Sequence, residues 1–135
     1  MLTYRQAIFS DRNHLIDLVK EHCIDSKLSY TEEAVAQYVT IGLNNTNALV
    51  AEVDGKVVGV ISFIVYNHQF TGIPCAKKIA WFVSKEHRGK VGLALLRKAE
   101  EEAKALGATH FYCSTPTKMV TDYMPIETEY QKELV

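Results

Sequence analysis

The stretch of sequence that decides the fold reads Phe82-Val83-Ser84-Lys85-Glu86-His87-Arg88-Gly89-Lys90-Val91-Gly92-Leu93-Ala94-Leu95-Leu96. An apolar strand runs into a basic loop that contains glycine, and the loop runs into a helix. Free N–H groups at a helix N-terminus attract anions, glycine lets the backbone approach a ligand, and Arg88 and Lys90 add positive charge. The pattern is typical of a phosphate or pyrophosphate site. A structural interpretation also fits, in which Gly89 makes a turn, Gly92 packs the helix, and the two cations are solvated.

The flanking residues extend this unit to a strand-helix-strand crossover. Residues 77–83 alternate as a strand does, with Ile79, Trp81 and Val83 on one face and Ala80 and Phe82 on the other, so we expect burial on both sides. Residues 108–114 predict a second strand. Residues 90–106 between them predict a helix that ends before a glycine and buries one common face: Leu95, Ala99, Ala103 and Leu106.

The N-terminal half predicts a strand, two helices and a hairpin. Residues 2–7 predict the strand, and Ser10 or Asp11 is expected to cap the first helix. The second helix is expected to begin near Thr31 and to end at Gly42. Residues 47–53 and 56–66 are rich in β-branched residues and flank Asp54-Gly55, a dipeptide that fits a type I′ hairpin turn. Residues 125–134 predict a last strand.

These elements predict one α/β domain over residues 1–135, with a mixed central sheet, helices on both faces and a short C-terminal region. The chain is 135 residues long and carries 15 basic and 16 acidic side chains, a net charge of −1, which argues against a nucleic-acid binder. The longest apolar stretch, residues 57–66, is far shorter than the roughly 18 residues of a membrane-spanning helix, so we expect a cytoplasmic protein with no membrane partner. The three cysteines lack metal-ligand or disulfide spacing, and no metal site is expected.

The loop resembles the pyrophosphate loop of the GCN5-related N-acetyltransferase (GNAT) superfamily. Residues 88–96, from Arg88-Gly89-Lys90 to Leu95-Leu96, are similar to the family's Arg-Gly-Lys-Gly-x-Gly-x-x-Leu-Leu with one residue missing, so that Val91 falls near the family's first loop glycine. The hairpin and the ending Tyr130-x-Lys132-x-Leu134 match the family as well. The resemblance covers nearly the whole chain and implies an N-acyltransferase that uses acetyl-CoA and releases CoA.

The resemblance also implies which residues bind the cofactor. Trp81, Phe82 and Val83 would lie along the pantetheine arm, with main-chain groups of Phe82 and Val83 pairing to it, and an N–H near Val83 would stabilise the oxyanion. Taken alone, Trp81 is better interpreted as a core aromatic residue, since an apolar residue that alternates in a strand needs no cofactor. The pyrophosphate would be held by the residues of the loop and the first helical turn: Arg88, Gly89, Lys90, Val91, Gly92, Leu93 and Ala94.

No catalytic residue identifies itself, and the candidates are Tyr123, Ser114, Glu33 and His68. Glu33 and His68 are possible bases, although a helix-start glutamate also serves the helix dipole. The family's usual tyrosine acid is replaced by Lys118, so Tyr123, Ser114, Lys118 or water would protonate the leaving thiolate. Cys113 is interpreted as an inert strand thiol, and a covalent mechanism through it is the alternative chemistry.

The predicted function is therefore acetyl-CoA-dependent transfer of an acetyl group to a primary amine, by direct attack in a ternary complex. The alternative is a non-catalytic GNAT-like protein that binds CoA or another protein as an interaction module. The acceptor, a small molecule or a protein, stays open, because an acidic amine site and a peptide groove fit equally well. An edge strand at the C-terminus would also allow a homodimer.

Overall fold

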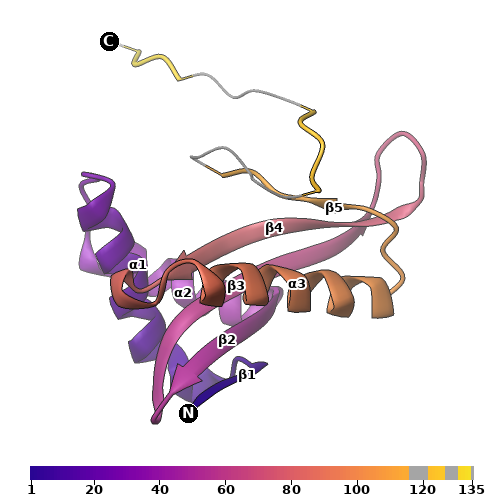
Figure 1. The fold of residues 1–135 in the computed structure, drawn as a ribbon. Helices are drawn as coiled ribbons and strands as arrows, with labels where there is room; N and C mark the ends of the chain where they lie inside the picture. Colours follow the sequence, from indigo (N-terminus) through magenta and orange to yellow (C-terminus); the bar gives the residue numbers. More distant parts are fainter. Residues whose placement is uncertain (116–121, 127–130, 135) are drawn as a thin grey trace.

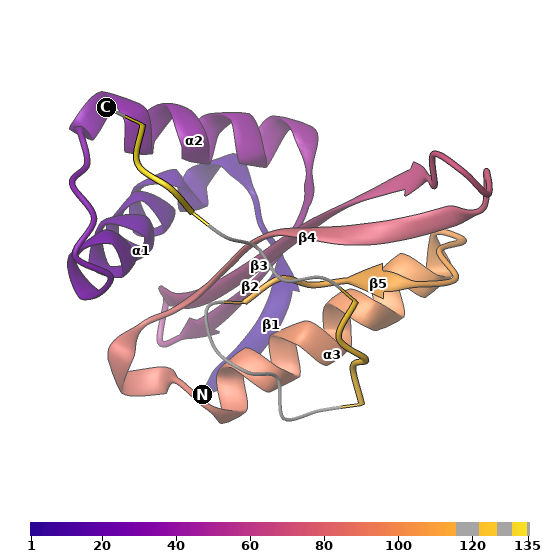
Figure 2. The same ribbon diagram turned by 90° about the horizontal axis from the view of Figure 1, so that it is seen from above.

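The computed structural model describes residues 1–115, 122–126 and 131–134, and it shows a mixed five-stranded sheet with helices on both faces (Figures 1 and 2). The sheet order is β1-β2-β3-β4-β5; the first three pairings are antiparallel, and β4–β5 is parallel. The predicted α/β class is confirmed. The elements are β1 (Leu2–Gln6), α1 (Arg12–Asp25), α2 (Glu32–Asn45), β2 (Asn47–Val53), β3 (Lys56–Asn67), β4 (Pro74–Val83), α3 (Lys90–Ala105) and β5 (Phe111–Tyr112).

The central hairpin forms where its turn dipeptide predicted it. Asp54 and Gly55 have φ angles of +49° and +81°, so both turn residues adopt the left-handed conformation that a type I′ turn requires. Val53 pairs directly with Lys56 across the turn. β3, the longest strand, continues from this turn and lies at the centre of the sheet, where its residues 57–63 are all buried.

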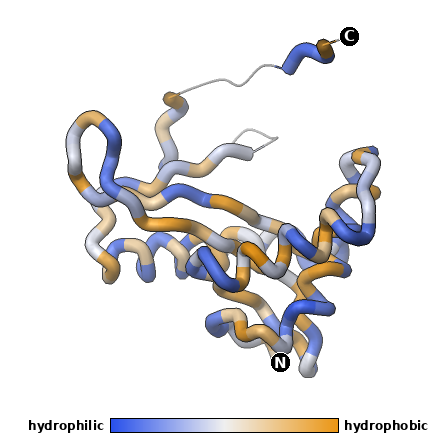
Figure 3. The backbone as a smooth tube through the Cα atoms, turned by 180° about the vertical axis from the view of Figure 1, so that it is seen from behind, coloured by the Kyte–Doolittle hydropathy of each residue, from blue (hydrophilic) through white to orange (hydrophobic). Residues whose placement is uncertain are grey.

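Two apolar cores lie on opposite faces of the sheet. On one face α3 buries Leu95, Leu96, Ala99 and Ala103 against residues of β3 that include Ile61 and Phe63. On the other face α1 and α2 bury a second set of residues, which includes Leu15, Val39 and Val60. The hydrophobic residues follow the strands at the centre of Figure 3, and hydrophobic and hydrophilic residues alternate along the helices, as amphipathic packing requires.

A bulge in β4 corrects the predicted strand faces. Ser62 pairs with Ala80 but Phe63 pairs with Lys78, so Ile79 is an extra residue with no partner on β3. Ile79 consequently lies on the α2 side and is 38% exposed, instead of sharing the buried face of Trp81 and Val83. The prediction that this strand is buried on both sides is therefore wrong at Ile79.

Other corrections concern the ends of the elements. α2 continues past Gly42 to Asn45, and α3 ends at Ala105, so that Leu106 is the C-cap residue and is 49% exposed. Asp11 stands at the N-cap of α1, but its side chain does not cap that helix; its carboxylate accepts two hydrogen bonds from the Arg5 guanidinium and one from the Ile8 N–H of the preceding turn, each 2.8 Å long. The strand expected at 108–114 is confined to β5.

The C-terminal region is described only in part. A strand is expected at residues 125–134, but the described residues 125, 126 and 131–134 are not in a strand, and residues 127–130 lie outside the described residues. Lys118, a candidate acid, also lies outside the described residues. No helix in the described part of the chain is long and apolar enough to span a membrane.

Candidate functional site

The start of α3 presents free N–H groups at the surface. Gly89 precedes the helix with a φ of +96°, a conformation that L side chains rarely adopt, and a Cβ added there would meet nothing within 4 Å. The first helical hydrogen bond runs from Leu93 N to Gly89 O, and no side chain caps the helix. The N–H groups of residues 90–92 therefore have no acceptor within the helix, at the end of the helix that favours an anion.

Arg88 holds a carboxylate at this position. Its Nη2 lies 2.6 Å from Asp25 Oδ2, at the end of α1, and its Nε donates to the carbonyl oxygen of Val83 at 3.2 Å. Lys85 Nζ lies 3.4 Å from the other oxygen of Asp25. The hydrogen bond from Arg88 and the charge of Lys85 lower the pKa of Asp25. The loop thus binds an anionic group of its own chain, and Asp25 is a site residue that the sequence reasoning missed.

The other predicted loop residues divide between packing and exposure. Trp81 Nε1 donates to the Gly92 carbonyl at 3.2 Å, and a Cβ at Gly92 would lie 3.7–3.8 Å from Val83 and Trp81, so Gly92 does pack the helix on the strand. Val91, which stands near the family's loop glycine, points its side chain into the core and is 5% exposed. The Val91 side chain therefore does not cover the N-terminal end of α3. Lys90 is exposed, and Leu93 and Ala94 follow on the first turn of α3.

One edge of β4 is open beside this loop. β5 pairs only with Ala76 and Lys77, so none of the described strands pairs with the rest of that edge. Ser84 N donates to Val58 O on β3, and the alternation of an antiparallel ladder turns the main chain of Phe82 toward β3 as well. The main-chain groups of Trp81 and Val83 consequently point away from β3, toward the open edge. This differs from the expectation that the main chain of Phe82 would face a ligand.

The four catalytic candidates do not come together. Glu33 is exposed in the first turn of α2. His68 lies in the β3–β4 turn, beyond the start of a ten-residue strand whose other end is Val83, which separates it from the loop by about 30 Å. Ser114 lies at the open edge, where its carbonyl accepts a hydrogen bond from Lys78 Nζ at 2.5 Å.

The fourth candidate, Tyr123, contacts α3 instead of the loop. Its hydroxyl donates to Glu100 Oε2 at 2.6 Å, ten residues, or about 15 Å, along the helix from Lys90. Burial and this hydrogen bond raise the pKa of Tyr123. Burial also raises the pKa of Cys113, which keeps its thiol protonated and disfavours it as a nucleophile. Among the described residues, no group of three or more metal-ligating side chains is placed to hold a metal.

The comparisons with known proteins identify the family. The model of the acetyltransferase (GNAT) family matches residues 13–119, and the chain belongs to this family. No curated protein matches the sequence. A GNAT family acetyltransferase from Staphylococcus aureus is similar in structure, with a TM-score of 0.76 and 19% identity over 98% of each chain.

Two further structures share the fold. A ribosomal-protein-alanine N-acetyltransferase from Brucella melitensis gives a TM-score of 0.72 and 18% identity over 96% of this chain and 99% of its own. The aminoglycoside N-acetyltransferase AAC(6')-Iy, solved in complex with CoA, gives a TM-score of 0.70 and 16% identity over 85% of this chain and 77% of its own. At these identities the likeness shows the fold, and the acceptor does not follow from it.

Proposed function

We propose that this chain is an acetyl-CoA-dependent N-acetyltransferase that transfers the acetyl group directly to a primary amine. The observation that carries the proposal is that two sets of main-chain groups without a helix or strand partner lie next to each other along the chain. One is the N–H groups at the start of α3, and the other is the open edge of β4 at Trp81 and Val83. Bound acetyl-CoA supplies a thioester whose acetyl carbon accepts a nucleophile.

The residues present suit a pyrophosphate and a pantetheine arm. The start of α3 would hold the pyrophosphate through the N–H groups of residues 90–92, and Arg88 would exchange Asp25 for it. Trp81 offers an N–H and a C=O group, and Val83 an N–H group, to the amides of the arm, as an added strand would, while the Val83 carbonyl accepts from Arg88. An N–H of this edge would stabilise the developing oxyanion, so that catalysis rests mainly on positioning.

Removal of a proton from the amine is the step for which the protein offers the fewest side chains. An alkylamine has a pKa of about 10.4 and must lose a proton before it attacks. Ser114 is the candidate closest to the open edge, and solvent water reaches it because it is exposed. We therefore assign proton removal to water, with Ser114 as the side chain that would orient it, and we assign no role in this step to His68.

A charge reversal at the loop tests the proposal. Titration calorimetry of the wild type should show binding of acetyl-CoA and CoA at micromolar affinity or tighter. Arg88→Glu with Lys90→Glu places two carboxylates against the pyrophosphate, and Kd should rise at least ~100-fold, or about 2.7 kcal/mol. Lys56→Glu with Lys104→Glu makes the same charge change at exposed positions away from the loop and should leave Kd unchanged. Equal affinity of the loop variant and this control would refute the phosphate assignment.

A CoA-binding module without catalysis is the second candidate. It is favoured by one observation, that the described catalytic candidates lie apart instead of converging on the open edge. Release of free CoA thiol, measured with acetyl-CoA and a panel of primary amines, separates the two. Thiol release that depends on the amine identifies the enzyme, and tight CoA binding without release identifies the module.

A further inference from the structure

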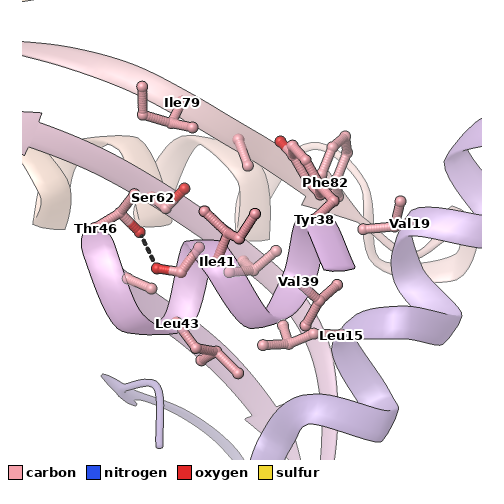
Figure 4. Close-up of a pocket in the computed structure, with 14 residues that line it drawn as sticks. Leu15, Val19, Tyr38, Val39, Ile41, Leu43, Thr46, Ser62, Ile79 and Phe82 are labelled. Atoms are coloured by element: carbon pink, nitrogen blue, oxygen red, sulfur yellow. Dashed lines mark hydrogen bonds between the residues drawn. The ribbon is translucent and has the colours of Figure 1, made fainter. Parts of the chain in front are cut away.

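A cavity of about 110 Å³ lies between α2 and the sheet (Figure 4). It is bounded by α1 and α2 on one side and by β3 and β4 on the other, and it opens to solvent beside Ile41 and Ile79, which are 53% and 38% exposed. Its lining includes Leu15, Val39, Ile41, Ser62, Ile79 and Phe82. A cavity of about 150 Å³ holds a benzene molecule, so this one suits a chain of four or five carbons.

The lining carries no charged side chain. Its polar side chains are Tyr38, Thr46 and Ser62, and the Thr46 hydroxyl already donates to the Gly42 carbonyl at 2.7 Å. An ammonium or carboxylate group placed at the buried end, beside Ser62, would lose hydration without gaining a partner of opposite charge. The cavity therefore discriminates against a second charge on its ligand.

Ser62 gives the cavity one buried polar contact. It is 5% exposed and stands in the run of buried residues 57–63 on β3. Its hydroxyl makes no hydrogen bond to any described residue, whereas every fully buried polar side-chain atom in that part of the chain has a partner. The Ser62 oxygen must therefore reach the space of the cavity, where a ligand can pair with it.

The cavity adjoins the open edge of β4. Ala80 and Phe82 line it, and they alternate along the strand with Trp81 and Val83, whose main chain faces that edge. Consecutive Cα atoms are about 3.8 Å apart, so a ligand that fills the cavity has its outer end beside the groups assigned to the thioester. The bulge at Ile79 forms part of the rim between the two.

We propose that this cavity selects the acceptor: a compact monoamine whose apolar chain enters the cavity and whose far end carries a neutral hydrogen-bonding group that pairs with Ser62. This inference rests on the proposed acetyl transfer and specifies its substrate class. The amino group stays at the rim, next to Trp81, and polyamines are excluded by the uncharged lining. Ser62 is then a residue that determines specificity, at a distance from the reacting atoms.

Three amines of matched length test this inference. They are 4-amino-1-butanol, pentylamine and 1,4-diaminobutane, which differ only in a hydroxyl, a methyl or an ammonium group at the far end. In the wild type kcat/KM should be highest for the amino alcohol, and the diamine should be at least ~10-fold poorer than pentylamine, because its second charge is buried without a partner. Ser62→Ala should lower kcat/KM about 5-fold for the amino alcohol alone, which corresponds to one hydrogen bond. Ser62→Thr, which keeps the hydroxyl, should retain the preference.

Binding of the same amines, followed by backbone amide NMR shifts, separates this inference from the proposed function. Shifts centred on Ser62 and Ala80, with the same ranking of affinities, support the cavity even where no amine is acetylated, and only the catalytic proposal then fails. The cavity assignment is overturned if the diamine is the best ligand, if Ser62→Ala affects all three amines equally or none, or if the shifts lie elsewhere. Thermal melts and acetyl-CoA affinity of both variants should equal those of the wild type.

Discussion

α3 packs so closely on its face of the sheet that a methyl group at Gly59 would lie 3.1 Å from Leu95, whereas α1 and α2 leave a cavity on the opposite face. β3 serves both faces, because alternate side chains point to opposite sides of a strand. Ile61 and Phe63 fill the α3 side, and Val60 and Ser62 face the α2 side. The difference indicates that the α3 face is the tightly packed part of the core, whereas the face covered by α1 and α2 retains space beside the candidate site.

Truncating a leucine on each face should give the largest difference. Leu95→Ala removes a side chain that is 0% exposed and should lower the free energy of unfolding by about 3 kcal/mol, while Leu15→Ala should lower it by about 2 kcal/mol because Leu15 already borders empty space. Leu93→Ala, at a position 44% exposed on α3, should change it by less than ~0.5 kcal/mol. Urea denaturation measures all three. Equal losses at Leu95 and Leu15 would mean that the cavity is filled in solution.

An ion pair between Arg5 and Asp11, just before α1, also stabilises the fold, and its contribution depends on pH. The hydrogen bonds from Arg5 lower the pKa of Asp11, so the carboxylate stabilises the fold above the unfolded pKa of about 3.9 and this contribution is lost as pH falls through the lower folded value. At pH 7 Asp11→Asn should reduce the free energy of unfolding by about 2 kcal/mol.

The pH dependence distinguishes this ion pair from an exposed one. Thermal melts of wild type and Asp11→Asn should converge as the pH falls through the lowered folded pKa of Asp11, because the wild-type carboxyl group is then protonated as well. Asp54→Asn, which removes an exposed pair with the N-terminus, should show no measurable difference at any pH. If the melting temperatures of wild type and Asp11→Asn still differed by the same amount at low pH, the stabilisation by Asp11 would not come from its charge.

Two glycine substitutions give the smallest effects and should differ in sign. Gly59→Ala crowds Leu95 and Val91 and should lower the free energy of unfolding by about 1 kcal/mol. Gly42→Ala, inside α2 and with nothing within 4 Å of the added Cβ, should raise it by about 0.5–1 kcal/mol through helix propensity. Chemical denaturation of the two variants measures how much space surrounds each glycine. A lower free energy of unfolding for Gly42→Ala would contradict the open packing of α2.

Elements governed by local chemistry could be predicted from the sequence, and those governed by distant contacts could not. The type I′ turn at Asp54-Gly55 and the strand-loop-helix unit at Gly89 depend on residues a few positions apart. The bulge at Ile79 depends on how β4 meets β3, and the Arg88–Asp25 pair joins residues 63 positions apart. Ser62 did leave a signal, as a lone hydroxyl in an apolar run, but its lack of a partner is visible only in three dimensions.

For the proposed pyrophosphate ligand, the ion pair between Arg88 and Asp25 would make the loop an ion-exchange site. An incoming anion has to replace a carboxylate that is already bound, and the displaced Asp25 belongs to the end of α1, next to the segment that leads into α2. Added salt weakens both the internal pair and the pair with the ligand, so affinity for an anion should depend less on ionic strength than at a bare cationic patch. In the proposed complex Asp25 would lose the hydrogen bond from Arg88 and keep the charge of Lys85, so one cation instead of two would hold the end of α1 whenever the loop is occupied.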